Sequence, residues 1–353
     1  MSITQTYPPP AIERLLVVGL GSIGRRHARL ARQMLKGVAI GALRRHAGAV
    51  DPDLGEIECF TSLEQALAFR PQAAVIANPA SQHLAVAFPL ARAGVHLMIE
   101  KPLTTSSDGV KELIDVCARR NVILMVGYNL RFLRSLQCFR ELIAANRVGQ
   151  VLSVRAEVGQ YLPSWRPQSD YRSGVSGVAA LGGGVLLELS HELDYLRWVF
   201  GDIAWVSAVQ LRQSMLEIDV EDTAHLTIGF APRADRAPLV ASLNLDFVRH
   251  DTTRCCIAIG ESGSLRWDAI AGTVAVFEQD GVGWQTLVSE PQRQDESILA
   301  EWNHFLHCIA GQSQPLVTAA DGLAIIRLVE AARRSSLHGM VVRLNSDVTA
   351  VQL

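Results

Sequence analysis

The sequence predicts a two-domain protein, with an N-terminal α/β domain on a doubly wound parallel sheet and a C-terminal α+β domain with a mostly antiparallel open sheet. Short apolar runs alternate with amphipathic helical segments over residues 1–127, and strand-like segments then follow one another from about residue 128. The length of 353 residues also suits two domains, which we expect at residues 1–127 and 128–353.

The N-terminal domain has the alternation of apolar strands with crossover helices that a parallel sheet requires. The strands are expected at Leu15–Leu20, Val38–Leu43, Ala73–Ala77, His96–Ile99 and Ile123–Val126. The helices are expected at Ser22–Leu35, Leu63–Phe69, His83–Ala93 and Ser107–Arg120.

The C-terminal domain opens with an expected helix at Ser135–Asn146 and then changes to period-2 segments, which favour a mostly antiparallel sheet with helices on one face. The strands are expected at Val151–Gln160, Ala204–Arg212, Ala224–Phe230, Leu239–Phe247, Cys255–Gly260 and Gly263–Trp267. Later helices are expected at Val185–Val199, Leu299–Ala310 and Asp321–Ser336, the last packing back on the core.

Composition and charge exclude several classes of protein. Lys and Arg number 33 against 35 Asp and Glu, so no basic excess marks a nucleic-acid partner. No apolar stretch is long enough to span a bilayer, so we expect no membrane partner, and the Pro-rich start does not read as a signal peptide. The 6 cysteines lack metal-ligand spacing, so we expect free thiols, no metal and a cytoplasmic location.

A glycine-rich turn of the form GxGxxG joins the first expected strand to the first helix at residues 19–24. In such a turn the first glycine permits a tight bend, the second lets the backbone approach a pyrophosphate, and the third allows close helix–strand packing. The helix N-terminus then offers free N–H groups to phosphate oxygens. The turn predicts a Rossmann domain that binds a dinucleotide through Gly19, Gly21, Ser22, Ile23 and Gly24.

Two arginines follow the second strand, where a site that prefers NAD places an acidic residue to bind the ribose hydroxyls. Arg44 and Arg45 carry guanidinium groups, which pair well with a 2′-phosphate. NADP(H) is therefore the favoured cofactor, with NAD(H) as the alternative. The alternative interpretation is that both arginines are solvated surface charges without a role in binding.

Further motifs lie at the expected element boundaries. Glu100-Lys101-Pro102-Leu103 follows the fourth strand, and Gly182-Gly183-Gly184 leads to His191 and Asp194. Other motifs are Ala77-Asn78-Pro79-Ala80-Ser81-Gln82-His83, Gly127-Tyr128-Asn129-Leu130-Arg131-Phe132 and the helix start Asp321-Gly322. With the glycine turn, these segments resemble the Gfo/Idh/MocA family of oxidoreductases, such as glucose–fructose oxidoreductase and inositol dehydrogenase, over nearly the whole chain. The resemblance adds cofactor contacts at Asn78, Pro79, His83, Glu100, Lys101 and Asn129.

Four residues are the expected catalytic groups: Lys101, His191, Glu188 and Asp194. Lys101 follows a strand at the carboxyl edge of the sheet, where ligands bind in open α/β folds, and can polarise a substrate oxygen. His191 suits the base that removes a hydroxyl proton as hydride leaves. Glu188 and Asp194 lie three residues either side of it on one expected helix. The resembled family commonly has an acid four residues before this histidine, where this chain has Leu187, so either acid remains a candidate partner.

A segment rich in aromatic and charged residues, YLPSWRPQSDYR at 161–172, is the expected substrate loop. Its alternative is a surface or subunit-contact loop. With Arg131 from the crossing segment, the expected substrate-binding residues are Arg131, Tyr161, Trp165, Arg166, Asp170, Tyr171 and Arg172.

Together these features predict an NAD(P)-dependent dehydrogenase or reductase of a sugar, nucleotide sugar or inositol-like polyol. The alternatives are an NAD(P)H-dependent C=N or C=C reductase and a non-catalytic dinucleotide-binding sensor. The resemblance also implies a homodimer or homotetramer.

Overall fold

The structure is a computed structural model that describes residues 12–46, 48, 52–232, 238–291 and 293–344. The chain divides into two compact units. Unit 1 is Met1–Asn129 with Ser297–Leu323, and unit 2 is Leu130–Glu296 with Ala324–Leu353. Residues 297–323, which we placed in the C-terminal domain, therefore group with the N-terminal segment.

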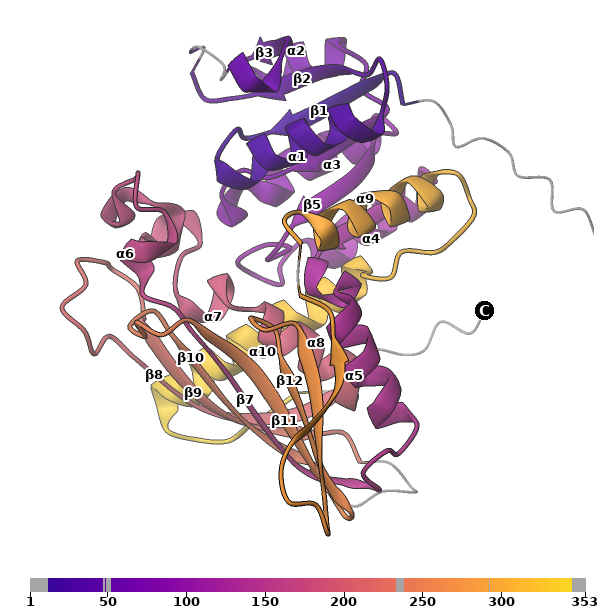
Figure 1. The fold of residues 1–353 in the computed structure, drawn as a ribbon. Helices are drawn as coiled ribbons and strands as arrows, with labels where there is room; N and C mark the ends of the chain where they lie inside the picture. Colours follow the sequence, from indigo (N-terminus) through magenta and orange to yellow (C-terminus); the bar gives the residue numbers. More distant parts are fainter. Residues whose placement is uncertain (1–11, 47, 49–51, 233–237, 292, 345–353) are drawn as a thin grey trace, which may run out of the picture. The chain divides into compact units, whose positions relative to one another are not determined.

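The sheet of unit 1 is parallel and has the strand order β3-β2-β1-β4-β5-β6 (Figure 1). Its strands are β1 (Arg14–Val18), β2 (Ala39–Leu43), β3 (Ile57–Phe60), β4 (Ala73–Ile76), β5 (His96–Glu100) and β6 (Leu124–Gly127). Its helices are α1 (Ser22–Met34), α2 (Leu63–Ala68), α3 (His83–Arg92), α4 (Val110–Arg119) and α9 (Glu296–Ile309). This is the doubly wound order of a dinucleotide-binding fold, which binds ligands where the order reverses, at the carboxyl ends of β1 and β4.

Helices cover both faces of this sheet. Leu15 and Val17 of β1 share one apolar core with Leu30 of α1 and Trp302 of α9. Leu16, which points to the opposite face, is also fully buried. Burial on both faces explains why these strands read as continuous apolar runs in the sequence.

Strand β3 was not expected from the sequence. Its four residues, Ile57–Phe60, include Glu58 and pair with β2 at the edge of the sheet. An edge strand needs less apolar character than a central one, so its pattern is weak.

The sheet of unit 2 has the order β14-β13-β12-β11-β7-β10-β9-β8-β15 and is antiparallel except for the parallel pair β7 and β10. The strands are β7 (Val151–Gly159), β8 (Ile203–Leu211), β9 (Thr223–Phe230), β10 (Val240–Asp246), β11 (Thr253–Gly260), β12 (Gly263–Asp268), β13 (Thr273–Glu278), β14 (Gln285–Ser289) and β15 (Val342–Arg343). The helices are α5 (Arg134–Ala144), α6 (Leu162–Trp165), α7 (Val185–Glu188), α8 (His191–Phe200) and α10 (Ala319–His338), whose first turn belongs to unit 1.

One face of this sheet is covered by helices, and the expected fold class is confirmed for both units. Trp267 of β12 donates from Nε1 to Ser135 Oγ of α5 at 3.1 Å and packs edge-on against Tyr195 of α8. At the other end, Ala208 N of β8 donates to Ser335 Oγ of α10 at 2.8 Å. Residues of β10 alternate between buried and exposed, so its second face is open. Among the described helices, none has both the length and the apolar character needed to cross a membrane.

Candidate functional site

The glycine turn between β1 and α1 packs closely against backbone atoms, both its own and those of the segment after β4. Gly19 has φ +85°, and a Cβ atom there would lie 2.9 Å from the carbonyl oxygen of Ala77. A Cβ at Gly24 would lie 1.9 Å from the carbonyl oxygen of Gly19. Gly21 differs, because no heavy atom lies within 4 Å of its Cβ position and its φ of −69° is ordinary. Packing therefore requires glycine at 19 and 24, whereas the space beside Gly21 is open to a ligand.

The first turn of α1 separates the expected contacts into two kinds. Ser22, the first residue of the helix, is exposed, as a group that faces a phosphate should be. Ile23 packs against the apolar core instead, so only its backbone N–H remains available to a ligand.

The segment after β4 lies against the glycine turn. The Asn78 backbone is 2.9 Å from the Cβ position of Gly19. The side-chain oxygen Oδ1 of Asn78 is buried and has no hydrogen-bond partner among the described residues. Because a buried polar atom without a partner costs free energy, this oxygen fits an outside donor such as a carboxamide N–H. Pro79 follows and begins a short 3₁₀ turn at Ala80–Gln82.

His83 connects this segment to the turn that follows β5. Its ring is fully buried, with Nε2 2.8 Å from the Asn78 carbonyl oxygen and Nδ1 3.2 Å from that of Leu103. Burial lowers the pKa of His83, so the ring is neutral near pH 7 and one of its nitrogens donates. His83 therefore orients the loop of Asn78, and both of its ring nitrogens contact backbone carbonyl oxygens of the protein rather than a ligand.

Lys101 follows the last residue of β5 and is half-buried. The peptide bond between Lys101 and Pro102 is cis. The backbone N–H of Lys101 donates to the Glu100 carboxylate at 3.1 Å, and Glu100 also pairs with His27. Glu100, expected as a cofactor contact, thus has protein partners on both carboxylate oxygens.

Three other expected cofactor residues, Arg44, Arg45 and Asn129, lie shortly after strands of unit 1. Arg44 follows β2 and donates from Nη1 to the carbonyl oxygen of Gly48 at 2.9 Å, while Arg45 is exposed. Asn129 donates from Nδ2 to Ser297 Oγ at 2.8 Å, which joins the end of the N-terminal segment to α9.

In unit 2, the triple-glycine turn packs against protein atoms. A Cβ at Gly183 would lie 2.5 Å from the carbonyl oxygen of Val175, and one at Gly184 would lie 2.5 Å from Glu221 Oε1. Glu221 Oε1 accepts from the backbone N–H of Leu186 at 3.2 Å, in the first turn of α7. Burial raises the pKa of Glu221. The turn therefore fixes the start of α7 by close backbone packing.

The expected continuous helix at Val185–Val199 is wrong. The chain forms α7 up to Glu188 and α8 from His191, with a break at Leu189 and Ser190. At this break Ser190 N donates to Leu187 O, three residues back instead of the four of an α-helix. Helical spacing therefore does not relate Glu188 to His191. Glu188 Oε2 instead accepts from Ser176 Oγ at 2.8 Å.

Asp194 and Arg131 form a buried bidentate ion pair. Arg131 donates from Nε to Asp194 Oδ2 at 2.9 Å and from Nη2 to Oδ1 at 2.6 Å, and both side chains are at most 3% exposed. The Arg131 guanidinium also lies 5.7 Å from the Trp198 ring. This placement revises two expectations, because the guanidinium of Arg131 is occupied by Asp194 rather than directed to a substrate, and both oxygens of Asp194 are bound by Arg131.

The expected substrate loop is tied to its surroundings at several points. Tyr161 stacks on His250 with ring centroids 4.3 Å apart, and Trp165 packs edge-on against Phe247 at 5.2 Å. These contacts lie at the carboxyl ends of the parallel pair β7 and β10. His250 had no signal of its own in the sequence, because an exposed histidine in a turn carries no pattern.

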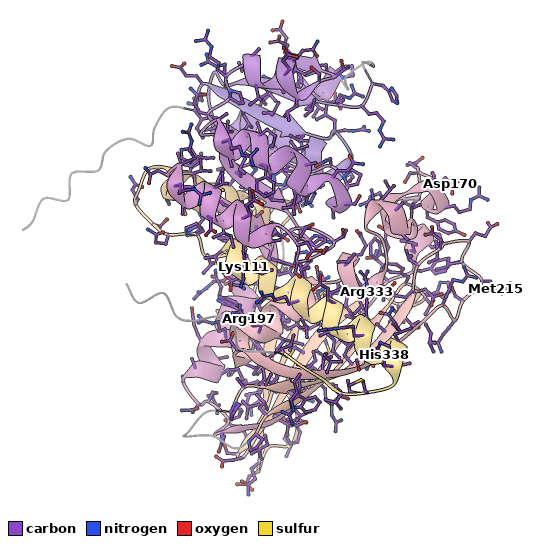
Figure 2. The ribbon with its side chains drawn as sticks, turned by 180° about the vertical axis from the view of Figure 1, so that it is seen from behind. Lys111, Asp170, Arg197, Met215, Arg333 and His338 are labelled. Carbon is purple, nitrogen blue, oxygen red and sulfur yellow. The ribbon has the colours of Figure 1, made fainter. Side chains whose placement is uncertain are left out.

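The second half of this loop is exposed, as Figure 2 shows for Asp170. Arg172 pairs with Asp170 and with Glu217, and Tyr171 Oη accepts weakly from Glu217 N at 3.5 Å. Exposed pairs of this kind contribute little stability. Arg172 borders a hollow of about 510 Å³ beside residues 212–219, while Arg166 is exposed.

Comparison with known proteins agrees with this geometry. Residues 14–128 match a family model described as an oxidoreductase family with an NAD-binding Rossmann fold, and residues 140–344 match its C-terminal alpha/beta domain. A myo-inositol 2-dehydrogenase of Thermotoga maritima is 25% identical, covering 95% of this chain and 99% of the relative.

Solved structures show the same fold over most of the chain. A levoglucosan dehydrogenase in complex with NADH and L-sorbose has a TM-score of 0.80 at 20% identity, covering 94% of this chain and 98% of that one. The WlbA dehydrogenase of Bordetella pertussis, in complex with NADH and UDP-GlcNAcA, has a TM-score of 0.78 at 24% identity, covering 95% and 99%.

The doubly wound sheet and the match over residues 14–128 define a class of protein, the oxidoreductases with an NAD-binding Rossmann fold. Within this class, the chain belongs to the Gfo/Idh/MocA family.

Proposed function

We propose that the chain is an NAD(P)-dependent dehydrogenase that transfers a hydride between the nicotinamide and a carbon bearing a hydroxyl or keto group. The substrate is a sugar, nucleotide sugar or inositol-like polyol. The observation that carries this proposal is the combination of a packed glycine turn, open only at Gly21, with the buried, unpartnered Oδ1 of Asn78 beside it. The names of the relatives, a myo-inositol dehydrogenase and a levoglucosan dehydrogenase, support this substrate class.

The residues of unit 1 hold the cofactor. The N-terminus of α1, with its exposed Ser22, would hold the pyrophosphate, and Asn78 Oδ1 would accept a hydrogen bond from an N–H donor of the cofactor such as its carboxamide. The bound cofactor supplies the carbon that accepts or releases the hydride.

Two side chains act on the substrate oxygen. Lys101 donates a hydrogen bond to it and stabilises the charge that develops there, while His191 accepts the hydroxyl proton. In the oxidation direction His191 takes the hydroxyl proton of the alcohol, and a bound nicotinamide would take the hydride, so that the alcohol becomes a ketone with release of one proton. Tyr161 and the exposed residues of the 161–172 loop contact the remainder of the substrate.

A substrate screen tests the proposal. The purified chain is incubated with NAD⁺ or NADP⁺ and panels of polyols, sugars and nucleotide sugars, and the absorbance of the reduced nicotinamide is followed. We expect turnover with at least one of these panels, and a product two hydrogen atoms lighter by mass spectrometry. Tight cofactor binding with no turnover of any panel would instead support a sensor.

Gly21→Val should lower the affinity for the dinucleotide by about tenfold or more, because the added side chain occupies the space that the pyrophosphate approaches. The melting temperature should change little, since no protein atom lies within 4 Å of the Cβ position. Gly283→Val is the matched control, because its Cβ position is equally open. Equal affinities of wild type and Gly21→Val would show that the turn does not hold the cofactor.

We propose that NADP(H) binds more tightly than NAD(H), with Arg44 and Arg45 on the 2′-phosphate. Arg44→Ala should weaken NADP(H) by about 1–3 kcal/mol and NAD(H) much less, because only the 2′-phosphate loses a charge-assisted bond. Titration calorimetry with both cofactors measures this, with Arg120→Ala as a control for loss of an exposed charge. A wild-type preference for NAD(H), the cofactor in the two similar structures, would contradict the proposal.

We further propose a cytoplasmic homodimer or homotetramer. All 6 cysteines are free thiols, which suits a reducing compartment. The open face of the unit 2 sheet exposes apolar side chains, including Val209 at 52% and Val240 at 37%, which suit a subunit contact. Light scattering on the eluting protein measures the mass, and a monomer at micromolar concentration would refute the oligomer.

A further inference from the structure

Four side chains of unit 1 form a buried group beside the carboxyl end of β5, which we call the Glu100 cluster: Glu100, His27, Trp302 and Glu301. They come from β5, from α1 and from α9, which lies far along the chain. His27, Trp302 and Glu301 are completely buried, and the Glu100 side chain is 12% exposed. Apart from Glu100, none of these residues has a place in the cofactor or substrate contacts described above.

A chain of hydrogen bonds runs through the cluster to Lys101. The indole Nε1–H of Trp302 donates to His27 Nδ1 at 2.9 Å. Because indole only donates, Nδ1 accepts, and the proton of the neutral imidazole must lie on Nε2. His27 Nε2 then donates to Glu100 Oε1 at 2.7 Å, and Glu100 Oε2 accepts from the backbone N–H of Lys101 at 3.1 Å.

Gly127 of β6 makes room for the Glu100 carboxylate. It pairs with Glu100 in the sheet, and a Cβ atom at Gly127 would lie 3.2 Å from both Cδ and Oε2 of Glu100. The carboxylate is therefore held on one side by His27 and on another by the backbone of the neighbouring strand.

Glu301 is the unusual member, because neither of its carboxyl oxygens has a hydrogen-bond partner among the described residues. Burial, and then the nearby negative charge of Glu100, raise the pKa of Glu301 well above its ordinary value. Burial also acts to raise the pKa of Glu100, but the hydrogen bond and the electrostatic interaction with His27, followed by the charge of Lys101, outweigh it and lower that pKa. Glu301 is therefore the protonated acid of the pair and Glu100 the carboxylate.

We propose that the Glu100 cluster positions Lys101 for catalysis. Trp302 and His27 fix the place of the Glu100 carboxylate, and this carboxylate fixes the backbone of Lys101 and faces its charge. Glu301 remains neutral, so the cluster carries a single negative charge opposite the single positive charge of Lys101. His27, Trp302 and Glu301 are positioning residues, and the proposal rests on the proposed function only for the role of Lys101.

The first experiment compares His27→Leu with His27→Gln. Leu has about the volume of His but cannot donate, whereas Gln can donate to Glu100. We expect His27→Leu to lower kcat about tenfold with KM and cofactor affinity within about threefold, and His27→Gln to restore most of kcat. His307→Leu, on the exposed side of α9, is the matched control and should behave as wild type.

The outcomes of this experiment separate two failures. If Lys101→Ala is inactive but His27→Leu turns over like wild type, the cluster does not position Lys101. If His27→Leu and His27→Gln are equally impaired, packing rather than the hydrogen bond matters, which also overturns the proposal. If Lys101→Ala turns over normally, the proposed role of Lys101 itself is wrong.

The second experiment needs no activity and tests the neutral state of Glu301. A carboxyl group whose pKa is raised on folding favours the fold fully below its unfolded pKa, about 4.5, and loses this contribution as pH rises towards the folded pKa. Gln is neutral at every pH, so the melting temperature of Glu301→Gln should rise relative to wild type between about pH 5 and pH 8. The other titratable groups that face the pair are His27, His83 and Lys101, which both proteins share.

Glu296→Gln, an exposed change at the start of α9, is the control and should keep a constant difference from wild type. A constant difference for Glu301→Gln as well would mean that Glu301 does not hold a proton in the folded protein. That result would overturn the single-charge arrangement of the cluster while leaving the proposed reaction untouched.

Discussion

Lys101→Ala should lower kcat by about 100-fold or more while the affinity for the dinucleotide changes little. Lys101 follows β5 directly, its backbone is held by Glu100, and its side chain is half-buried, so its ammonium group interacts strongly with charge that develops on a substrate oxygen. An interaction made chiefly in the transition state lowers kcat rather than raising KM when it is lost. Steady-state kinetics with the substrate found in the screen, and fluorescence titration of the reduced cofactor, measure the two quantities.

The matched control is Lys111→Ala, because Lys111 is an exposed lysine on α4 of the same unit (Figure 2). It should leave kcat within about twofold of wild type, since it removes the same charge without a contact to the site. If the turnover of Lys101→Ala were close to that of Lys111→Ala, Lys101 would have no role in catalysis.

His191→Asn should lose about 99% of alcohol oxidation near neutral pH and should flatten the acidic limb of the rate profile. His191 is the first residue of α8, directly after the break at Leu189 and Ser190, and is half-buried. A neutral imidazole accepts the hydroxyl proton, so the wild-type rate should rise with pH through the ordinary histidine range, about 6–7. Asn keeps hydrogen bonding but has no basic nitrogen, so the measurement is kcat against pH for both proteins.

His338→Asn provides the control, because His338 is an exposed histidine at the end of α10 (Figure 2). Its pH profile should match that of wild type. If His191→Asn retained the wild-type profile and a kcat within about threefold, the proton would leave by another route, and Lys101 and Tyr161 would be the groups to test next.

The sequence alone was sufficient for the fold class and for the cofactor turn, because both depend on local signals. Continuous apolar runs with helices between them require a parallel sheet covered on both faces. Gly24 is required by the backbone of the same turn, because a Cβ atom there would lie 1.9 Å from the carbonyl oxygen of Gly19. The motifs and their order pointed to the oxidoreductase family, which the comparison confirmed.

Weak local patterns explain the elements that were missed. Strand β3 is a short edge strand with a glutamate in it, and β14 is a mostly exposed edge strand of the second sheet. The break between α7 and α8 falls at Leu189 and Ser190, inside a segment of mixed apolar and polar residues without Gly or Pro, where periodicity does not distinguish one helix from two.

Only the tertiary structure decided which side chains meet across long stretches of chain. Arg131 and Asp194 are 63 residues apart, and each alone reads as a polar group available for a ligand, yet they neutralise each other in the interior. Trp302 and His27 are 275 residues apart, and α9 reads from the sequence as an ordinary amphipathic helix of the second domain. Spacing along the chain determines local backbone geometry, whereas burial and its effect on charge depend on which distant segments pack together, so the partners of Asp194, Glu100 and Glu301 became known only from the fold.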